Sequence, residues 1–214
     1  MKLYGTYYPE IEEKFNIISH GIGVVLSLIA FPFLIYKAFK TNDLLVVLSF
    51  VIYGLSMIVL YTASTLFHMA VHKKFRHYLN IFDHASIYVL IAGTYAPVAL
   101  VVLQGSVGWL LFGLSWVFAI LGVFYKVYFI GKYRLLSILS YLAMGWMIVL
   151  AINPLLQNLS PEGIKLLLFG GIFYSIGAIF FIFKHVPYNH AIFHVFVLLG
   201  SLCHFIAIYC FVLE

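Results

Sequence analysis

The chain contains seven apolar stretches, each long enough to cross a lipid bilayer as a helix. A spanning helix needs about 20 predominantly apolar residues, because the hydrocarbon core is roughly 30 Å thick. The stretches cover residues 17–37, 44–68, 79–101, 106–126, 134–154, 163–184 and 190–212. Backbone polar groups must be satisfied inside a bilayer, which favours helices over open strands. The sequence therefore predicts an all-α, polytopic membrane protein, with residues 1–214 forming a single seven-helix transmembrane domain.

Composition excludes the soluble classes of protein. The chain is 64% hydrophobic and only 9% charged, whereas a soluble domain carries about 25% charged residues. Too few polar side chains are present to cover a soluble surface, so an ordinary soluble enzyme, a nucleic-acid-binding module and a disordered tail are all excluded. The net charge of +5 is better explained by membrane topology than by a nucleic-acid partner.

The distribution of basic residues between the loops predicts the orientation, because cytoplasmic loops of membrane proteins carry an excess of Lys and Arg. The face that holds the N-terminus carries nine of them, and the opposite face carries three: Lys2, Lys14, Lys73, Lys74, Arg76, Lys126, Lys132, Arg134 and Lys184 against Lys37, Lys40 and Lys165. We therefore expect a multi-pass protein of the cell (plasma or inner) membrane, with its N-terminus in the cytoplasm and its C-terminus outside.

Four ionisable residues lie at a similar predicted depth, near the cytoplasmic face. His68 ends the second stretch, Asp83 follows the start of the third, and His190 and His194 begin the seventh. Residues at i and i+4 share one helix face, so His190 and His194 can present two imidazoles to one ion, and His68 supplies a third. Three imidazoles with a fourth position left open are typical of a catalytic zinc site. The sequence predicts Zn²⁺ bound by His68, His190 and His194.

Two further residues are candidates for catalysis. Asp83 is the only carboxylate inside the predicted spans, and it can either bind the metal directly or accept a proton from a water that zinc has acidified. Ser64 lies one turn before His68 on the same helix face, where it can hydrogen-bond that water or a substrate carbonyl. Asn189 is the predicted N-cap of the last helix.

The remaining histidines are weaker candidates for metal ligands. His20, at the cytoplasmic end of the first span, is the main rival for a fourth ligand. His204 lies about 15 Å beyond His194 at a helical rise of 1.5 Å per residue, which is too far to share its metal. His72 and His77 stand in a basic stretch, and we expect both to face solvent or lipid headgroups.

The chain resembles the haemolysin III branch of the progestin and adipoQ receptor family over essentially its whole length. The motifs that carry the resemblance are Glu13-x-x-Asn16-x-x-Ser19-His20, Ser64-x-x-x-His68, Phe82-Asp83-His84, His190-Ala191-Ile192-Phe193-His194 and His204-Phe205. The resemblance implies an intramembrane zinc with His68, His190 and His194 as ligands, Asp83 at the zinc water, and Ser64 as the serine of the pattern. The wider superfamily includes alkaline ceramidases, which implies cleavage of a lipid amide or ester, with ceramide the best-known substrate class.

Three classes of function fit these expectations. The first is a zinc-dependent hydrolase of a membrane lipid, similar to a ceramidase. The second is a non-enzymatic sensor or regulator of membrane homeostasis, in which zinc only ties helices together. The third is a membrane-lytic haemolysin. Only the family name suggests this cytolysis, and no residue of the sequence indicates it. The predicted partner in each case is membrane lipid.

Overall fold

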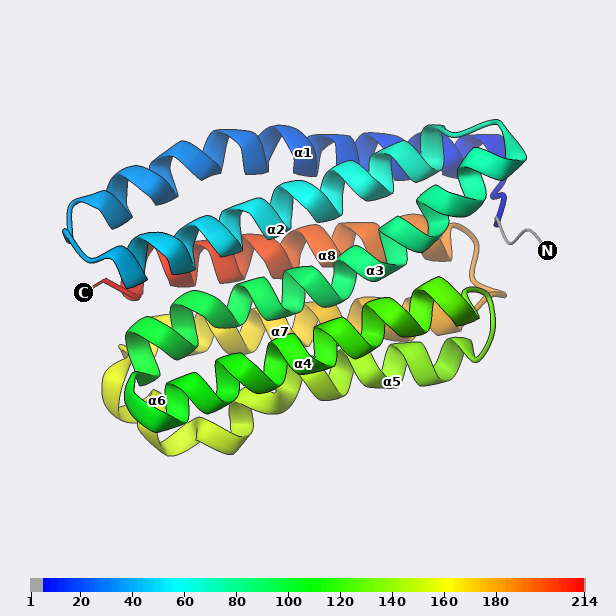
Figure 1. Cartoon of the computed structure of the whole chain (residues 1–214). Helices are drawn as coiled ribbons and strands as arrows, with labels where there is room; N and C mark the ends of the chain where they lie inside the picture. The colour runs from blue at the N-terminus through cyan, green and yellow to red at the C-terminus, as the bar shows by residue number, and fades with distance from the viewer. Residues whose placement is uncertain (1–5, 214) are drawn as a thin grey trace.

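A computed structural model describes residues 6–213 of the chain, and these residues form a helical bundle with no strand among them (Figure 1). Within that range seven spans are long and apolar enough to cross a membrane. The elements are α1 (Glu10–Phe39), α2 (Leu44–Met69), α3 (Lys73–Pro97) with η1 (Val98–Leu103), α4 (Gly105–Phe129), α5 (Arg134–Gly145) with η2 (Trp146–Ala151) and α6 (Ile152–Asn158), α7 (Pro161–Ile182), and α8 (Asn189–Ile206) with η3 (Ala207–Phe211). The predicted all-α, seven-helix membrane fold is confirmed. Of the basic residues counted for topology, Lys2 lies outside the described residues.

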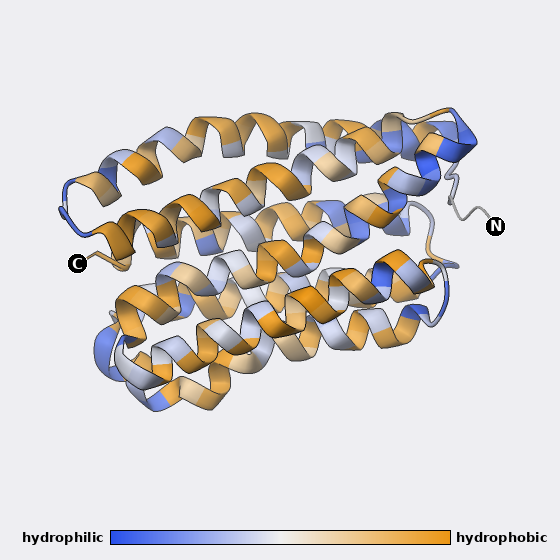
Figure 2. Ribbon diagram, in the orientation of Figure 1, coloured by the Kyte–Doolittle hydropathy of each residue, from blue (hydrophilic) through white to orange (hydrophobic). Residues whose placement is uncertain are grey.

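Successive spans run in opposite directions, so α1, α3, α5 and α8 begin at the same end of the bundle (Figure 1). We call this the N-terminal end. In the bundle α1 packs against α2 and α8, α2 against α3, α3 against α4, and α7 against α8, whereas α5 contacts its neighbours only sparsely. Hydrophilic residues gather at the N-terminal end and in the loops, while the helix shafts are hydrophobic (Figure 2).

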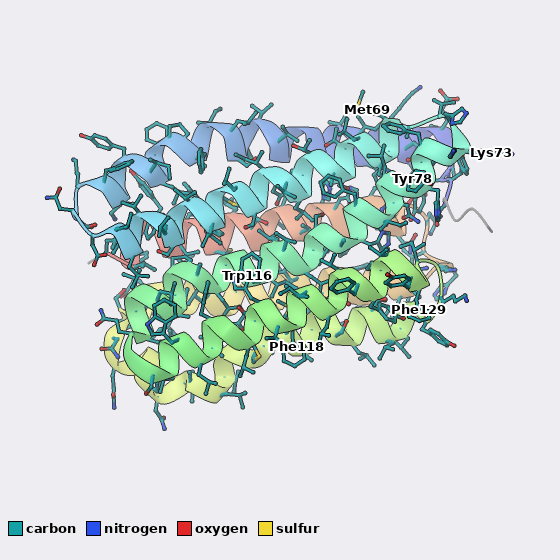
Figure 3. The ribbon with its side chains drawn as sticks, viewed as in Figure 1. Met69, Lys73, Tyr78, Trp116, Phe118 and Phe129 are labelled. Carbon is teal, nitrogen blue, oxygen red and sulfur yellow. The ribbon has the colours of Figure 1, made fainter. Side chains whose placement is uncertain are left out.

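The outer surface of the bundle is apolar, as a lipid-facing surface must be. Met69, Tyr78, Phe118 and Phe129 project outward from α2, α3 and α4, and each is exposed (Figure 3). Helix ends are fixed locally. The Asp43 carboxylate accepts hydrogen bonds from the first backbone N–H groups of α2, which is the usual role of an N-cap residue.

The fifth span is interrupted, although the apolar stretch 134–154 predicted one helix. It passes from α5 through the 3₁₀ segment η2 to the short helix α6. The Tyr95 hydroxyl, from α3, lies at the break: it donates to the carbonyl oxygen of Met144 at 2.9 Å and accepts from the N–H of Ile148 at 2.9 Å. A neighbouring helix thus satisfies backbone groups that the break leaves free, as is required inside a bilayer.

Helix α1 begins at Glu10, about two turns before the apolar stretch that starts at residue 17. These additional turns are polar, yet Glu12 and Asn16 are buried because this part of α1 packs between α2 and α8. The extension brings polar side chains from the start of the chain to the ends of the helices that carry the predicted metal ligands.

Candidate metal centre

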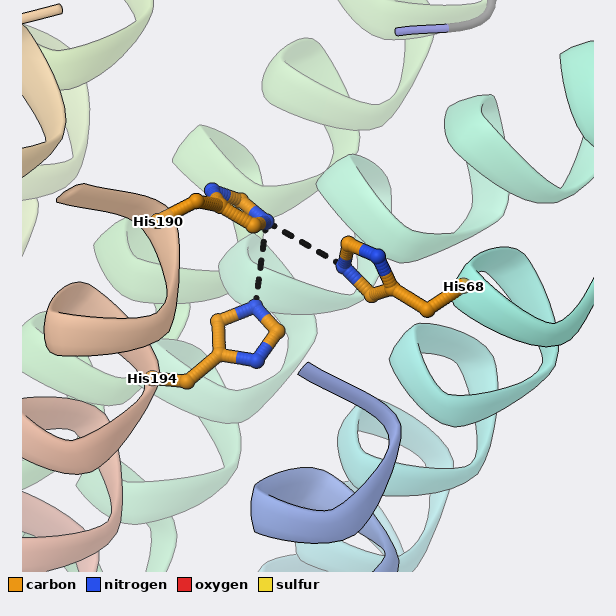
Figure 4. Close-up of side chains that lie close together, drawn as sticks. All are labelled: His68, His190 and His194. Atoms are coloured by element: carbon orange, nitrogen blue, oxygen red, sulfur yellow. Dashed lines mark hydrogen bonds between the residues drawn. The ribbon is translucent and has the colours of Figure 1, made fainter. Parts of the chain in front are cut away.

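Three histidines from two distant helices converge at the N-terminal end of the bundle. His68 lies in the last turn of α2, and His190 and His194 lie in the first two turns of α8. All three are nearly completely buried, with 3%, 3% and 1% of their surface exposed. The Nε2 atom of His190 lies 3.2 Å from Nε2 of His68 and 3.1 Å from Nε2 of His194 (Figure 4). The three predicted ligands are therefore brought together.

The spacing of these nitrogens fits a tetrahedral metal ion. Nitrogen ligands at about 2.0–2.1 Å from a tetrahedral zinc are about 3.3 Å from one another, close to the separations of 3.1 and 3.2 Å found here. Ligand atoms of all three histidines lie within 4.8 Å of one another. Three imidazoles would fill three of the four positions around a tetrahedral ion and leave one for water. The triad can hold a metal ion.

Asp83 and Ser64 lie beside the triad. Asp83, on α3, is 7% exposed and lines the same cavity as His190 and His194. Its carboxylate is not in the set of mutually close ligand atoms. Ser64 is fully buried, and its hydroxyl lies next to the Asp83 carboxyl group. Nδ1 of His84 lies 3.6 Å from Oδ2 of Asp83, so the carboxylate also has a contact within α3.

His20 approaches the triad without joining it. Its ring stacks on that of His194, with the centroids 3.5 Å apart and the planes at 10°, and its edge faces Tyr61. Neither ring nitrogen of His20 has a hydrogen-bond partner among residues 6–213. Because its nitrogens lie outside the set of three converging ligands, His20 occupies the position of a packing neighbour.

Residues of α1 contact the outer nitrogens of the ligands, and their role was not predicted from the sequence. His68 Nδ1 lies 2.6 Å from Oε2 of Glu13, and His194 Nδ1 lies 3.3 Å from the Ser19 hydroxyl. Glu13, Asn16 and Ser19 had been used only as marks of a resemblance. Glu13, Asn16 and Ser19 are spaced three residues apart, which places them on one face of a helix. This spacing indicates a shared role once the first helix is taken to begin at Glu10.

The expectation that His77 faces solvent or headgroups is wrong, whereas His72 is exposed as expected. The first turn of α3 folds back against the end of α2, so its inner face is covered while its outer lysines stay exposed. Arg76 and His77 lie on that inner face, with exposures of 2% and 3%. The Arg76 guanidinium donates to carbonyl oxygens at the end of α2 and to the Glu13 carboxylate.

The predicted cap of the last helix is also corrected. Asn189 is the first helical residue of α8, and Tyr188, with φ 56°, precedes it. The Asn189 amide instead donates to the carbonyl oxygen of Phe180 at 3.2 Å, so it ties the start of α8 to the end of α7. This bond helps to fix the position of His190, the next residue.

Tyr8 covers the triad at the N-terminal end. Its ring stacks on that of His190, with the centroids 4.5 Å apart and the planes at 12°. Burial raises the pKa of the Tyr8 phenol above its usual value, which keeps the hydroxyl neutral. The segment before α1 is therefore part of the wall of the site.

An apolar cavity of about 290 Å³ extends from the triad along the bundle, between α3, α8 and the segments from α5 to α7. His190 and Asp83 lie at one end, and Leu155 and Ile164 lie toward the other. Val149 also lines the cavity and is 51% exposed, so the cavity comes close to the lipid-facing surface. His204 lines it too, and its Nε2 lies 3.1 Å from the carbonyl oxygen of Leu167, well away from the metal ligands.

Comparisons with known proteins agree with this arrangement. The model of a family described as haemolysin-III related matches residues 9–205. The chain is 46% identical to Hemolysin-3 of Bacillus cereus over 202 residues, which is 94% of this chain and 92% of that protein. It is 47% identical to the Hemolysin-3 homolog of Bacillus subtilis over 201 residues, 93% of this chain and 94% of that protein. It is also 30% identical to the human Monocyte to macrophage differentiation factor, over 74% of this chain and 68% of that protein.

Proposed function

The chain belongs to the haemolysin-III-related family of integral membrane proteins, and from this premise we propose that it is a zinc-dependent hydrolase of a membrane lipid. The observation that carries the proposal is the position of the triad. Three converging imidazole nitrogens lie at one end of an apolar cavity, with a buried carboxylate beside them. The chemistry of hydrolysis and the space for a lipid chain are thus adjacent.

His68, His190 and His194 would hold the ion. Imidazole suits zinc among the common divalent metals, and three histidine ligands with a fourth position for water are one of the ligand sets of catalytic zinc. When bound, zinc acidifies water and polarises a carbonyl oxygen. The remaining roles fall to side chains of the protein.

Asp83 is placed to move a proton. Its carboxylate lies on the cavity wall next to the ligands without being one of them, which suits acceptance of a proton from water and its delivery to the leaving amine or alcohol. The Ser64 hydroxyl, next to the Asp83 carboxyl group, can donate a hydrogen bond to the substrate carbonyl oxygen as negative charge develops there.

The cavity favours a substrate with a long apolar chain. Its wall is mostly apolar along the bundle, and His190, His194 and Asp83 lie at the end that holds the triad. A lipid amide or ester with its acyl chain in the cavity would present its carbonyl to the triad, and a ceramide-like amide is the first substrate to test. The excess of basic residues in the loops at the N-terminal end supports a position of this chemistry near the cytoplasmic leaflet.

The test is hydrolysis by purified, zinc-loaded protein in vesicles that contain ceramide and a trapped dye. We expect release of fatty acid, and we expect Asp83→Asn to reduce turnover by about 10²–10⁴-fold, the usual contribution of a general base, while its zinc content stays that of the wild type. Asp43→Asn, at the opposite end of the bundle, is the matched control, because Asn also serves as an N-cap.

Two results would contradict the proposal. If Asp83→Asn hydrolyses the lipid at the native rate, Asp83 is not the general base. Bound zinc without turnover of any lipid amide or ester supports a membrane regulator in which the metal is structural. The names of the bacterial relatives refer to haemolysis, and dye release that is unchanged in His68→Ala would support lysis independent of the metal.

A further inference from the structure

The outer nitrogen of His68 contacts a carboxylate. Nδ1 of His68 lies 2.6 Å from Oε2 of Glu13, with the His68 side chain fully buried and that of Glu13 15% exposed. The Asn16 side-chain amide lies 3.4 Å from the same Nδ1. The contact with Glu13 is much shorter, and hydrogen bonds to an ionised group are about twice as strong as neutral ones. The contact with Glu13 therefore determines whether Nδ1 of His68 carries a proton.

This contact fixes the proton on His68. A neutral imidazole carries one proton, on Nδ1 or on Nε2, and an ionised carboxylate can only accept. Beside Glu13 the proton lies on Nδ1, so the lone pair is on Nε2, the atom that faces His190 at 3.2 Å. The other tautomer would put a hydrogen on Nε2 and block it as a metal ligand.

Arg76 holds Glu13 in place. Its guanidinium binds Oε1 of Glu13, which also accepts from the backbone N–H of Tyr8 at 3.2 Å, so Oε2 is left for His68. Arg76 also donates to the carbonyl oxygens of Phe67 at 3.2 Å and Ala70 at 3.0 Å, on either side of His68. One buried side chain thus fixes the carboxylate relative to the end of the helix that carries the ligand.

We propose that Glu13, held by Arg76, is a positioning residue that sets the tautomer and orientation of His68 and thereby the metal affinity of the triad. The inference rests on the proposed metal site. Partners that orient ligating histidines typically change metal affinity by 10–100-fold when they are removed. Glu13 does not touch the metal position, so its effect passes through His68.

The experiment compares Glu13→Gln with Glu10→Gln. Glutamine keeps the size of the side chain but can turn its NH₂ toward Nδ1, which favours the wrong tautomer. Glu10 is in the first turn of the same helix, exposed and paired with Lys14. Zinc affinity is measured by competition with a chromophoric chelator, and the tautomer of His68 in metal-free protein is read from ¹⁵N chemical shifts of labelled histidine.

We expect Glu13→Gln to weaken zinc binding by about 10–100-fold and to move the His68 proton toward Nε2, and Glu10→Gln to change neither. If Glu13→Gln does not fold, Glu13→Asp keeps the charge, and it should retain the Nδ1–H tautomer with an intermediate affinity. Native zinc affinity in Glu13→Gln, or an unchanged His68 spectrum, would overturn the inference. If the wild type binds no zinc, the proposed function fails, while the ¹⁵N spectrum still tests the effect of Glu13 on His68.

Discussion

The packing of α7 against α8 yields a prediction whose size follows from the structure. Gly170, on α7, lies where α8 comes closest. A Cβ atom at this position would lie 2.2 Å from Cδ2 and 2.4 Å from Nε2 of His204, and 3.1 Å from the carbonyl oxygen of Gly200. In Gly170→Ala the His204 ring must therefore move, and its contact with the carbonyl oxygen of Leu167 is lost.

Two effects of Gly170→Ala lower the free energy of unfolding, and one effect raises it. Overpacking of a closely packed region costs about 1–3 kcal/mol, and a buried polar group without its partner costs about 1–3 kcal/mol. Alanine in place of glycine in a helix returns about 1 kcal/mol. We expect the free energy of unfolding of Gly170→Ala to fall by about 1–5 kcal/mol.

The assay is thermal unfolding in detergent, with Gly113→Ala as the matched control. Gly113 lies in the exposed middle of α4, where an added Cβ meets no atom within 4 Å, so this variant should be as stable as the wild type or up to about 1 kcal/mol more stable. If Gly170→Ala is as stable as Gly113→Ala, α7 and α8 are not packed as described, and the position of the α8 ligands must be reconsidered.

Two further predictions concern the metal and the topology. Removal of the metal with a chelator should lower the unfolding temperature, because a ligand that binds only the native state stabilises that state. Zinc, but not magnesium, should restore the unfolding temperature. If the chelator leaves the unfolding temperature unchanged, no metal ion is bound. In a background with Cys203→Ser and Cys210→Ser, a membrane-impermeant maleimide should label Lys40→Cys in intact cells and Lys132→Cys only after lysis, and the reverse pattern would invert the topology.

The fold and the triad could be predicted because both depend on local features of the sequence. Spanning helices follow from the length of apolar stretches, and the i, i+4 spacing of His190 and His194 places both on one face whatever surrounds them. His68 follows from topology alone: four spans, an even number, separate the end of the second span from the start of the seventh, so both lie at the same end of the bundle.

The outer contacts could not be predicted by the same reasoning. Glu13 precedes the first apolar stretch, where a charged residue is ordinarily solvated, and the contact of α1 with α2 and α8 covers most of its side chain. Arg76 was counted as a basic loop residue, yet the fold turns it inward under the end of α2. These positions depend on how three helices pack, and hydropathy and spacing along a single helix do not contain that information.

The interruption of the fifth span was missed for a related reason. The stretch 134–154 is uniformly apolar, so length predicts one helix. The break is stabilised by the Tyr95 hydroxyl, which comes from α3 and bonds to backbone groups on both sides of it. A partner 49 residues away in sequence leaves no mark on local hydropathy.

The central claim is that the three histidines hold one metal ion, and metal analysis tests it most directly. Detergent-purified wild type, His190→Ala and His185→Ala would each be loaded with zinc, desalted and analysed for bound metal. His185 is the matched control, because it is exposed in the loop before α8. The account predicts one zinc per chain in the wild type and in His185→Ala, and none in His190→Ala. Equal metal in all three proteins, or none in the wild type, would contradict it.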